Sequence, residues 1–210
     1  MSNYVLEAND VAIHYGGVKA VDGVSLTLER GQIRGLIGPN GAGKSTVIDA
    51  ITGRTRLTRG TVHLAGQDVT ALGATQRRMR GLSRSFQRTS IFGQMAVRQQ
   101  VELASHKMGV ADSGADADAV LQELDLLPLA NATAEDLGYG QQRRLDLALA
   151  LVGRPQVLLL DEPMAGPVGA GIARPGQAPE GTDLALGRVG AAGRTRHGRG
   201  LRHLRCGHGF

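Results

Sequence analysis

The segment that most constrains the fold is residues 38–45, GPNGAGKS, which fits the pattern G-x-x-x-x-G-K-[ST]. An apolar run at 33–37 precedes it, and residues 47–53 follow with the apolar spacing of a helix that ends near Gly53. The sequence therefore predicts a buried strand, a glycine-rich loop and a helix in direct succession. The alternative, an ordinary glycine-rich turn before a helix, is disfavoured by the complete pattern in this context.

Such a loop is suited to hold phosphate. Its glycines let the backbone turn N–H groups inward, and the helix that begins near Lys44 adds its positive dipole end. The Lys44 ammonium can reach the β- and γ-phosphates of a nucleotide, and the Ser45 hydroxyl can ligate Mg²⁺. We therefore expect a site for ATP and Mg²⁺ that is formed by Gly38, Pro39, Asn40, Gly41, Ala42, Gly43, Lys44, Ser45 and Thr46.

A second motif is VLLLDEP at 157–163. Its continuous apolar run is typical of a parallel strand buried on both faces. Asp161 and Glu162 follow at the carboxyl end, where α/β sheets bind ligands. We expect Asp161 to hold Mg²⁺ through water and Glu162 to act as the general base for an attacking water. In isolation, such a pair is commonly a strand end that faces solvent.

The remaining elements are predicted more coarsely. Short β-rich runs predict strands at 4–8, 11–14, 24–28 and 61–65, and apolar periodicity predicts helices at 96–107, 116–127 and 141–152. A local basic cluster is formed by Arg77, Arg78, Arg80, Arg84 and Arg88. Its ordinary interpretation is a solvated face, and contact with a transmembrane partner or acidic lipid is the functional alternative.

Residues 137–144, LGYGQQRR, lie just upstream of the strand at 157–160. Together with the two motifs above they resemble the ABC ATPase family, whose signature sequence opens a helix at this place. The resemblance covers residues 4–166 and is greatest to the ATP-binding subunits of branched-chain amino acid importers. The runs GLSRSFQRTSIF and YGQQRRLDLA carry that closer likeness.

The resemblance implies further site residues. Tyr15 lies where the family has an aromatic that stacks on adenine. Without the resemblance, a tyrosine packed on a strand is an equally good interpretation. Gln87 resembles the family's Q-loop glutamine, a catalytic residue and Mg²⁺ ligand that also contacts the transmembrane partner; alone it is an ordinary loop residue. The signature residues would meet the nucleotide of an opposite subunit, and they are Gly138, Tyr139, Gly140 and Gln141. Gly138 replaces the family's serine, which implies weaker hydrolysis.

The implied fold is α/β, a P-loop NTPase of the ABC type with an antiparallel β-subdomain and a helical subdomain inserted over about 88–140. The implied activity is ATP hydrolysis that drives uptake of small solutes, with branched-chain amino acids the favoured substrate and urea an alternative. The implied partners are transmembrane permease subunits and a second ATP-binding subunit, without nucleic acid. No apolar run approaches the roughly 18 residues of a membrane-spanning helix. The resemblance implies a peripheral protein on the cytoplasmic face of the plasma membrane.

The composition changes near Gly166, which divides an ABC ATPase domain at 1–166 from a tail at 167–210. The chain has a net charge of +5, but residues 1–166 carry 17 basic and 17 acidic residues. The tail carries seven arginines against two acids and holds 11 of the 31 glycines. The positive excess therefore belongs to the tail and gives no reason to expect nucleic-acid binding by the body. The lone cysteine, Cys206, excludes an internal disulfide.

The tail departs from the family pattern. It shows no strand or helix periodicity, so we expect it to be disordered and the C-terminal part of the core to be missing or replaced. We assign the family's switch role to none of His197, His203 and His208. Loss of about five large apolar residues beside the strand at 157–160 would cost on the order of 10 kcal/mol. Because a whole domain is stable by about 5–15 kcal/mol, we expect a marginally stable chain.

We hypothesise that the tail is an out-of-frame reading of the family's own C-terminal region. Residues 193–201, GRTRHGRGL, can be encoded so that a shift by one base gives V-E-H-D-M-D-A-V, and E-H-D is what the family has at its switch histidine. Sequencing the coding DNA tests this. Three alternatives stay open: a genuine divergent C-terminus, a non-catalytic ATP-binding remnant of a disrupted gene, and a DNA-linked ABC ATPase. The short, Cys-free gap between Gln87 and Leu137 disfavours the last.

Overall fold

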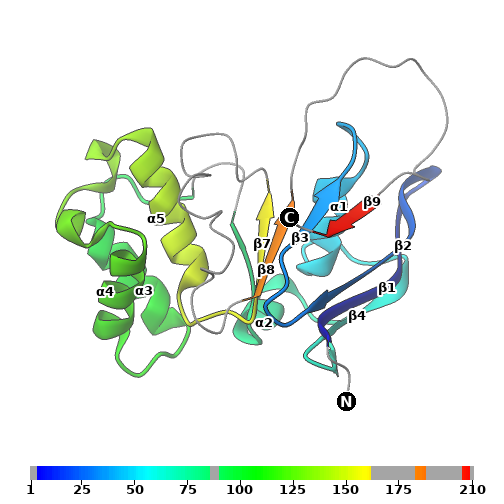
Figure 1. Ribbon diagram of the computed structural model, residues 1–210, viewed down its shortest axis with the longest axis horizontal. Coiled ribbons are helices and arrows are strands. Elements are labelled where there is room, and N and C mark those ends of the chain that lie inside the picture. The colour runs from blue at the N-terminus through cyan, green and yellow to red at the C-terminus, as the bar shows by residue number, and fades with distance from the viewer. Residues whose placement is uncertain (1–3, 86–89, 162–182, 188–204, 209–210) are drawn as a thin grey trace.

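The computed structural model describes residues 4–85, 90–161, 183–187 and 205–208, the last two ranges as backbone. Two sheets lie side by side (Figure 1). The first is antiparallel, and a group of helices lies next to the second, on the side away from the first. Within these described ranges, no helix has both the length and the apolar character needed to cross a membrane.

The first sheet is the predicted antiparallel β-subdomain. It has the order β2-β1-β4-β5 and is formed by β1 (Tyr4–Tyr15), β2 (Val18–Glu29), β4 (Arg59–Leu64) and β5 (Gln67–Asp68). The two short strands that the sequence predicts at its start are one strand, β1. A register shift between Ala8 and Val11 and a left-handed Asp10, with φ 50°, form an irregularity where the sequence reads as a break.

The second sheet has the order β6-β7-β8-β3-β9. Its strands are β6 (Leu82–Ser85), β7 (Val157–Asp161), β8 (Asp183–Gly187), β3 (Arg34–Ile37) and β9 (Arg205–His208). The first four run parallel, and β9 pairs antiparallel with β3 at the edge. All five residues of β7 are buried. Leu158 and Leu160 face the core of the helical side, whereas Val157 and Leu159 face the core of the β side. The prediction of a strand buried on both faces is confirmed.

The tail departs from the sequence-based expectation beside β7. β8 pairs with β7 from Val157↔Asp183 to Asp161↔Gly187 and also with β3, so the position beside β7 that was expected to be empty is filled. The apolar stretch of β8 is too short to produce a periodic signal, which is why it was missed. β7 therefore has a strand on each side, and the marginal stability expected from the sequence stays a prediction. His197 and His203 lie outside the described residues, and His208 belongs to β9.

The helices are α1 (Lys44–Ile51), α2 (Ala74–Met79), α3 (Val97–Lys107), α4 (Ser113–Glu123) and α5 (Tyr139–Leu151), with short 3-10 turns at Leu127–Leu129 and Ala134–Asp136. The helix predicted at 116–127 begins earlier because the Asp112 carboxylate accepts from Ala115 N at 2.9 Å and caps the first turn. Residues 97–151 supply the core of the helical side, which agrees with an inserted helical subdomain. α2 and β6 were not predicted because each is too short to show a period.

The arginine cluster is not a solvated face. Arg77 is only 2% exposed. Its guanidinium donates to the carbonyl oxygens of Leu72, Thr70 and Ala50 at 2.8–2.9 Å and to that of Ile51. Burial lowers the pKa of Arg77 from its ordinary value, and these carbonyls compensate the buried charge. Arg80 alone among the described members is exposed and bonds within its own helix.

Replacing Arg77 is expected to destabilise the fold strongly. Arg77→Met removes the donor that four carbonyls at the end of α1 and before α2 share, and a buried carbonyl left unpaired costs about 1–3 kcal/mol. We expect a loss of about 3 kcal/mol or more in the free energy of unfolding, measured by urea denaturation. The matched variant Arg80→Met, on the exposed side of α2, should change it by less than about 0.5 kcal/mol. Equal effects of the two substitutions would show that Arg77 has no special role.

Candidate functional site

The predicted phosphate loop connects β3 to α1 at the carboxyl edge of the parallel strands (Figure 1). Gly41 and Gly43 have φ of 77° and 79°, in the left-handed region that glycine adopts without strain. A Cβ built on Gly41 would meet no atom within 4 Å, so the space beside the loop is open. The backbone can therefore approach a ligand closely at this point.

Lys44 crosses this loop. Its Nζ donates to Gly38 O at 2.8 Å and to Pro39 O at 2.7 Å, so the ammonium is held over the loop by the loop's own carbonyls. α1 begins at Lys44, and the N–H groups of a helix's first turn have no partner within the helix. Ser45 is exposed and Thr46 half-buried on that turn. The fixed cation, the helix N-terminus and the open glycine backbone make a cradle for a polyphosphate.

Asp161 ends β7 at the same edge and is 8% exposed. Its Oδ2 accepts from Nη2 of Arg84 at 3.0 Å, and Nη1 of Arg84 bonds Oδ1 of Asp49 on α1. Sequence reasoning counted Arg84 in a surface cluster and missed this contact. The available signal was its place three residues before Gln87, in the run that resembles the family's Q-loop segment. Gln87 and Glu162 lie outside the described residues, so their roles stay predictions.

The described residues fit a magnesium ion that arrives with a nucleotide. Among these residues there is no group of three or more His, Cys, Asp or Glu side chains that could hold a metal alone. The Asp161 carboxylate and the Ser45 hydroxyl are oxygen donors of the kind that Mg²⁺ prefers. Mg²⁺ is commonly held by one or two protein groups together with substrate phosphates. The donor set therefore suits a nucleotide-bound Mg²⁺ better than a resident ion.

Tyr15 ends β1 at the tip of the β1–β2 hairpin. It is 56% exposed, which does not fit a packed core aromatic and leaves the ring open to a stacking partner. Its cross-strand partner is Val18, which is 66% exposed. Val18 was missed by sequence reasoning, although an apolar residue directly after a Gly-Gly turn was the available signal. The two side chains form an exposed apolar pair next to the turn.

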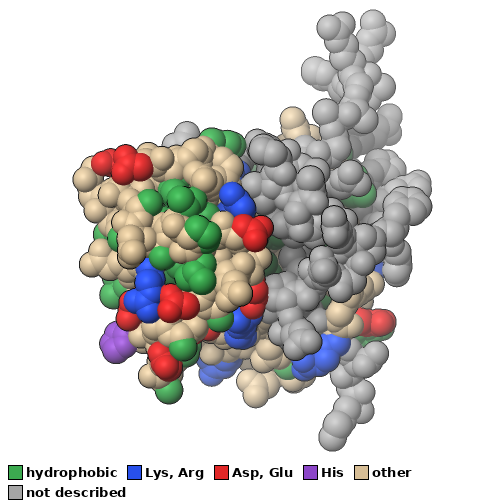
Figure 2. All heavy atoms as spheres, turned by 60° about the vertical axis from the view of Figure 1, so that its left-hand side comes forward, with side chains coloured by type: hydrophobic (Ala, Val, Ile, Leu, Met, Phe, Trp, Pro, Cys, Tyr) green, Lys and Arg blue, Asp and Glu red, His purple; other side chains and the backbone are tan. Residues whose placement is uncertain are grey.

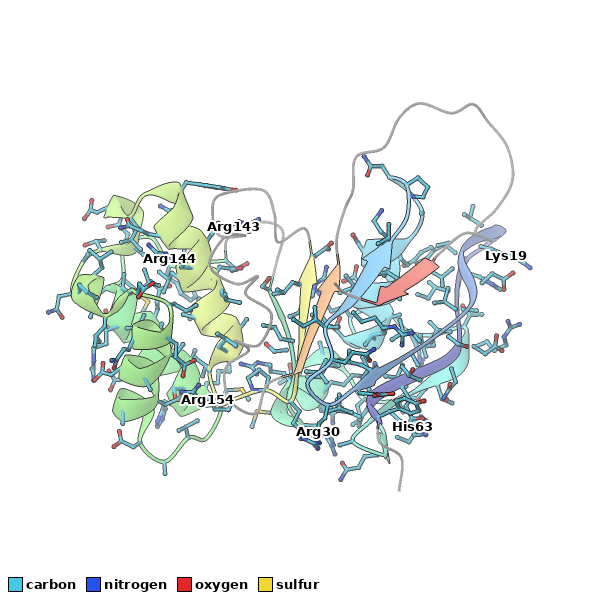
Figure 3. The ribbon with its side chains drawn as sticks, viewed as in Figure 1. Lys19, Arg30, His63, Arg143, Arg144 and Arg154 are labelled. Atoms are coloured by element: carbon cyan, nitrogen blue, oxygen red, sulfur yellow. The ribbon has the colours of Figure 1, made fainter. Side chains whose placement is uncertain are left out.

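The signature residues lie at the start of α5, on the far side of β7 from the phosphate loop (Figure 1). The Gln141 Oε1 accepts from Gly138 N at 2.8 Å, which satisfies one free donor at the helix start. Tyr139 is 56% exposed. Arg143 and Arg144 project from the next turn of α5 (Figure 3). Within one chain the structure does not bring the signature to the phosphate loop.

Restoring the family's serine at Gly138 is expected to raise turnover. Gly138 has φ −62° and ψ 155°, and an added Cβ would only touch Gln141 Oε1 at 3.6 Å, so serine fits without strain. A new hydrogen bond to a charged phosphate contributes roughly 1.5–3 kcal/mol, so Gly138→Ser should raise kcat about tenfold or more in the assembled transporter. The control is Gly73→Ser, where Gln76 accepts from the Gly73 N–H at the start of α2. No gain over this control would contradict the role given to position 138.

Comparisons with known proteins agree with this geometry. A family model described as ABC transporter matches residues 21–165. The chain is 36% identical to the high-affinity branched-chain amino acid transport ATP-binding protein BraF of Pseudomonas aeruginosa and 38% identical to LivG of Salmonella typhimurium, a protein of the same description. Each match covers 79% of this chain and 72% of the relative.

Solved structures show the same fold. The ATP-binding cassette MJ1267 of an ABC transporter superposes with a TM-score of 0.69 at 28% identity, over 79% of this chain and 71% of that chain. The cbiO1 protein from Clostridium perfringens, part of an ABC transporter complex, superposes with a TM-score of 0.77 over 90% of this chain and 80% of that chain. At 23% identity the second likeness supports the fold alone.

Proposed function

This chain belongs to the ABC transporter family of ATP-binding domains, and on that premise we propose that it binds ATP with Mg²⁺ and hydrolyses it to drive import of branched-chain amino acids. The family consists of ATP-hydrolysing transporter subunits. The observation that carries the proposal is Lys44, which is held over an open glycine loop at the same sheet edge as Asp161. The substrate is inferred from the names of relatives at 36–38% identity.

The nucleotide would extend from the hairpin tip to the sheet edge. Its adenine would stack on Tyr15 beside Val18, and its phosphates would lie on the N–H groups of the loop and of the first turn of α1. The Lys44 ammonium would leave its two carbonyls for phosphate oxygens. Ser45 and Asp161 would hold Mg²⁺, which when bound neutralises charge on the β- and γ-phosphates.

Catalysis would need two further groups from outside the described residues. Glu162, next in sequence to Asp161, would accept the proton of the attacking water, and Gln87 would orient that water. The signature at the start of α5 lies on the far side of β7 from its own chain's loop. We therefore propose a head-to-tail pair of ATP-binding subunits in which each signature meets the nucleotide on the other subunit.

The site for a membrane partner would be a cavity of about 460 Å³ between α2, β6, α3 and α5. Apolar side chains such as Met79, Leu82 and Met108 line it. Two polar residues, Arg84 before and Ser90 after segment 86–89, line it as well. Arg78 also lines it, and its Nη1 is buried and finds no acceptor among the described residues. A permease segment with apolar residues would suit the apolar side chains of this cavity. Figure 2 shows hydrophobic side chains interspersed with charges of both signs on the helical side.

The proposed function is tested by transport in the native host. Deleting the gene should abolish ATP-dependent uptake of labelled leucine, isoleucine and valine, and a plasmid with the wild-type gene should restore it. The Lys44→Ala gene is the matched control and should not restore it. Unchanged uptake of all three amino acids after deletion would contradict the proposed substrate, and loss of urea uptake instead would reassign it.

A second candidate function is that of a non-catalytic ATP-binding subunit, and the place where the family match ends favours it. The family model stops at residue 165, and the chain continues to residue 210 without it. A non-catalytic ATP-binding subunit would retain the phosphate loop but lack groups that follow Glu162 in the family. Such a chain binds ATP with normal affinity and releases no phosphate. Measuring binding and hydrolysis on the same preparation separates the two candidates.

A further inference from the structure

Arg84 joins three elements at the nucleotide site. It lies on β6, its Nη2 bonds Oδ2 of Asp161 at the end of β7, and its Nη1 bonds Oδ1 of Asp49 on α1. The Arg84 side chain is 10% exposed and that of Asp161 9%. The two contacts use the two terminal nitrogens of one planar guanidinium. Because that group is rigid, it holds the two carboxylates at a set position relative to each other.

The two carboxylates belong to the elements that carry the proposed Mg²⁺ ligands. Asp161 is itself one of these residues and is expected to hold Mg²⁺ through water. Asp49 lies four residues after Ser45 on α1, which places both side chains on one face of that helix. The relative position of Ser45 and Asp161 therefore depends on how α1 sits against β7. Arg84 is the side chain that spans this junction.

Magnesium makes this junction important. Mg²⁺ demands near-ideal octahedral geometry, and groups that orient metal ligands through hydrogen bonds commonly change metal affinity 10- to 100-fold when they are removed. The contact from Arg84 holds Oδ2 of Asp161, and Oδ1 of the same carboxylate is not used in it.

We propose that Arg84 is a positioning residue for the magnesium site, which holds α1 and β7 at the separation that lets Ser45 and Asp161 bind one Mg²⁺ ion. The inference rests on the proposed function, because it takes these two residues as the ligands. It also distinguishes two roles of the same arginine. A positioning role requires both arms of the guanidinium, whereas a purely electrostatic role requires only its charge.

The test measures how much Mg²⁺ strengthens ADP binding. For each variant of the full chain, the ADP dissociation constant is measured by calorimetry twice, in saturating Mg²⁺ and in EDTA. The ratio of the two constants is then compared with that of the wild type. A general loss of structure weakens both measurements and cancels in the ratio. Arg84→Gln should reduce the Mg²⁺-dependent gain at least about tenfold. Arg84→Lys, which keeps the charge but has only one ammonium, should also reduce it, by a smaller factor.

The competing results are distinct. If only the charge matters, Arg84→Gln removes a cation near Mg²⁺ and enlarges the gain, while Arg84→Lys leaves it unchanged; either result would overturn the inference. Arg80→Gln is the control on the exposed side of α2 and should leave the ratio as in wild type. Wild type that binds ADP with no gain from Mg²⁺ also overturns the inference, whereas wild type that binds no ADP overturns the proposed function. If Arg84→Gln does not fold, the result for Arg84→Lys alone decides between the positioning role and the purely electrostatic role.

Discussion

Lys44→Ala is expected to abolish ATP hydrolysis and to weaken ATP binding about 100-fold or more. The ammonium of Lys44 is held by Gly38 O and Pro39 O at 2.7–2.8 Å, so it is in place over the loop before a nucleotide arrives. Two hydrogen bonds from this cation to phosphate oxygens contribute about 1.5–3 kcal/mol each. Calorimetry with ATP in the presence of Mg²⁺ measures the loss.

The control for this substitution is Lys19→Ala. Lys19 lies at the outer end of the β1–β2 hairpin (Figure 3), where its Nζ pairs with Asp22 at 3.0 Å and its side chain is 64% exposed. Removing it takes the same charge from the chain without touching the loop. ATP affinity in Lys44→Ala equal to that in Lys19→Ala would show that the loop is not the phosphate site.

Glu162→Gln is expected to have the opposite combination of effects, with ATP binding retained and turnover reduced about 10²- to 10⁴-fold. A general base contributes this factor, and an amide cannot accept the proton of the attacking water. The substitution keeps size and shape, so the dissociation constant for ATP should change little. Phosphate release under single-turnover conditions measures the chemical step. The matched change Glu135→Gln alters a carboxylate that lies in a 3-10 turn of the helical side.

The outcome for Glu162→Gln decides whether Glu162 is the general base. An active wild type and a slow variant identify Glu162 as the base. Turnover in Glu162→Gln equal to that of wild type would remove Glu162 from the mechanism, even if the phosphate loop binds ATP as expected.

The nucleotide-binding part of the fold could be predicted from the sequence because its signals are local. The loop at 38–45 fixes a strand before it and a helix after it, and the continuous apolar run of β7 has one simple structural meaning. Both predictions are confirmed by β3, α1 and β7. Long periodic helices such as α3 and α5 were also located within about two residues.

The rest depended on contacts between distant segments. The arginines near residue 80 look like a charged surface in sequence, and only the folded chain shows that Arg77 bonds the end of α1 and that Arg84 bridges Asp49 and Asp161. β8 has a short apolar stretch and becomes recognisable through its pairing with β7 and β3. Tertiary pairing of this kind leaves no periodic signal in one sequence.

Mg²⁺-dependent phosphate release by the purified 210-residue chain, measured beside ATP binding on the same preparation, tests the central claim most directly. We expect saturable ATP binding, and phosphate release that depends on Mg²⁺ and is absent from Lys44→Ala. Absence of ATP binding, or phosphate release that does not exceed the Lys44→Ala background, would contradict the assignment of this chain as a working transport ATPase.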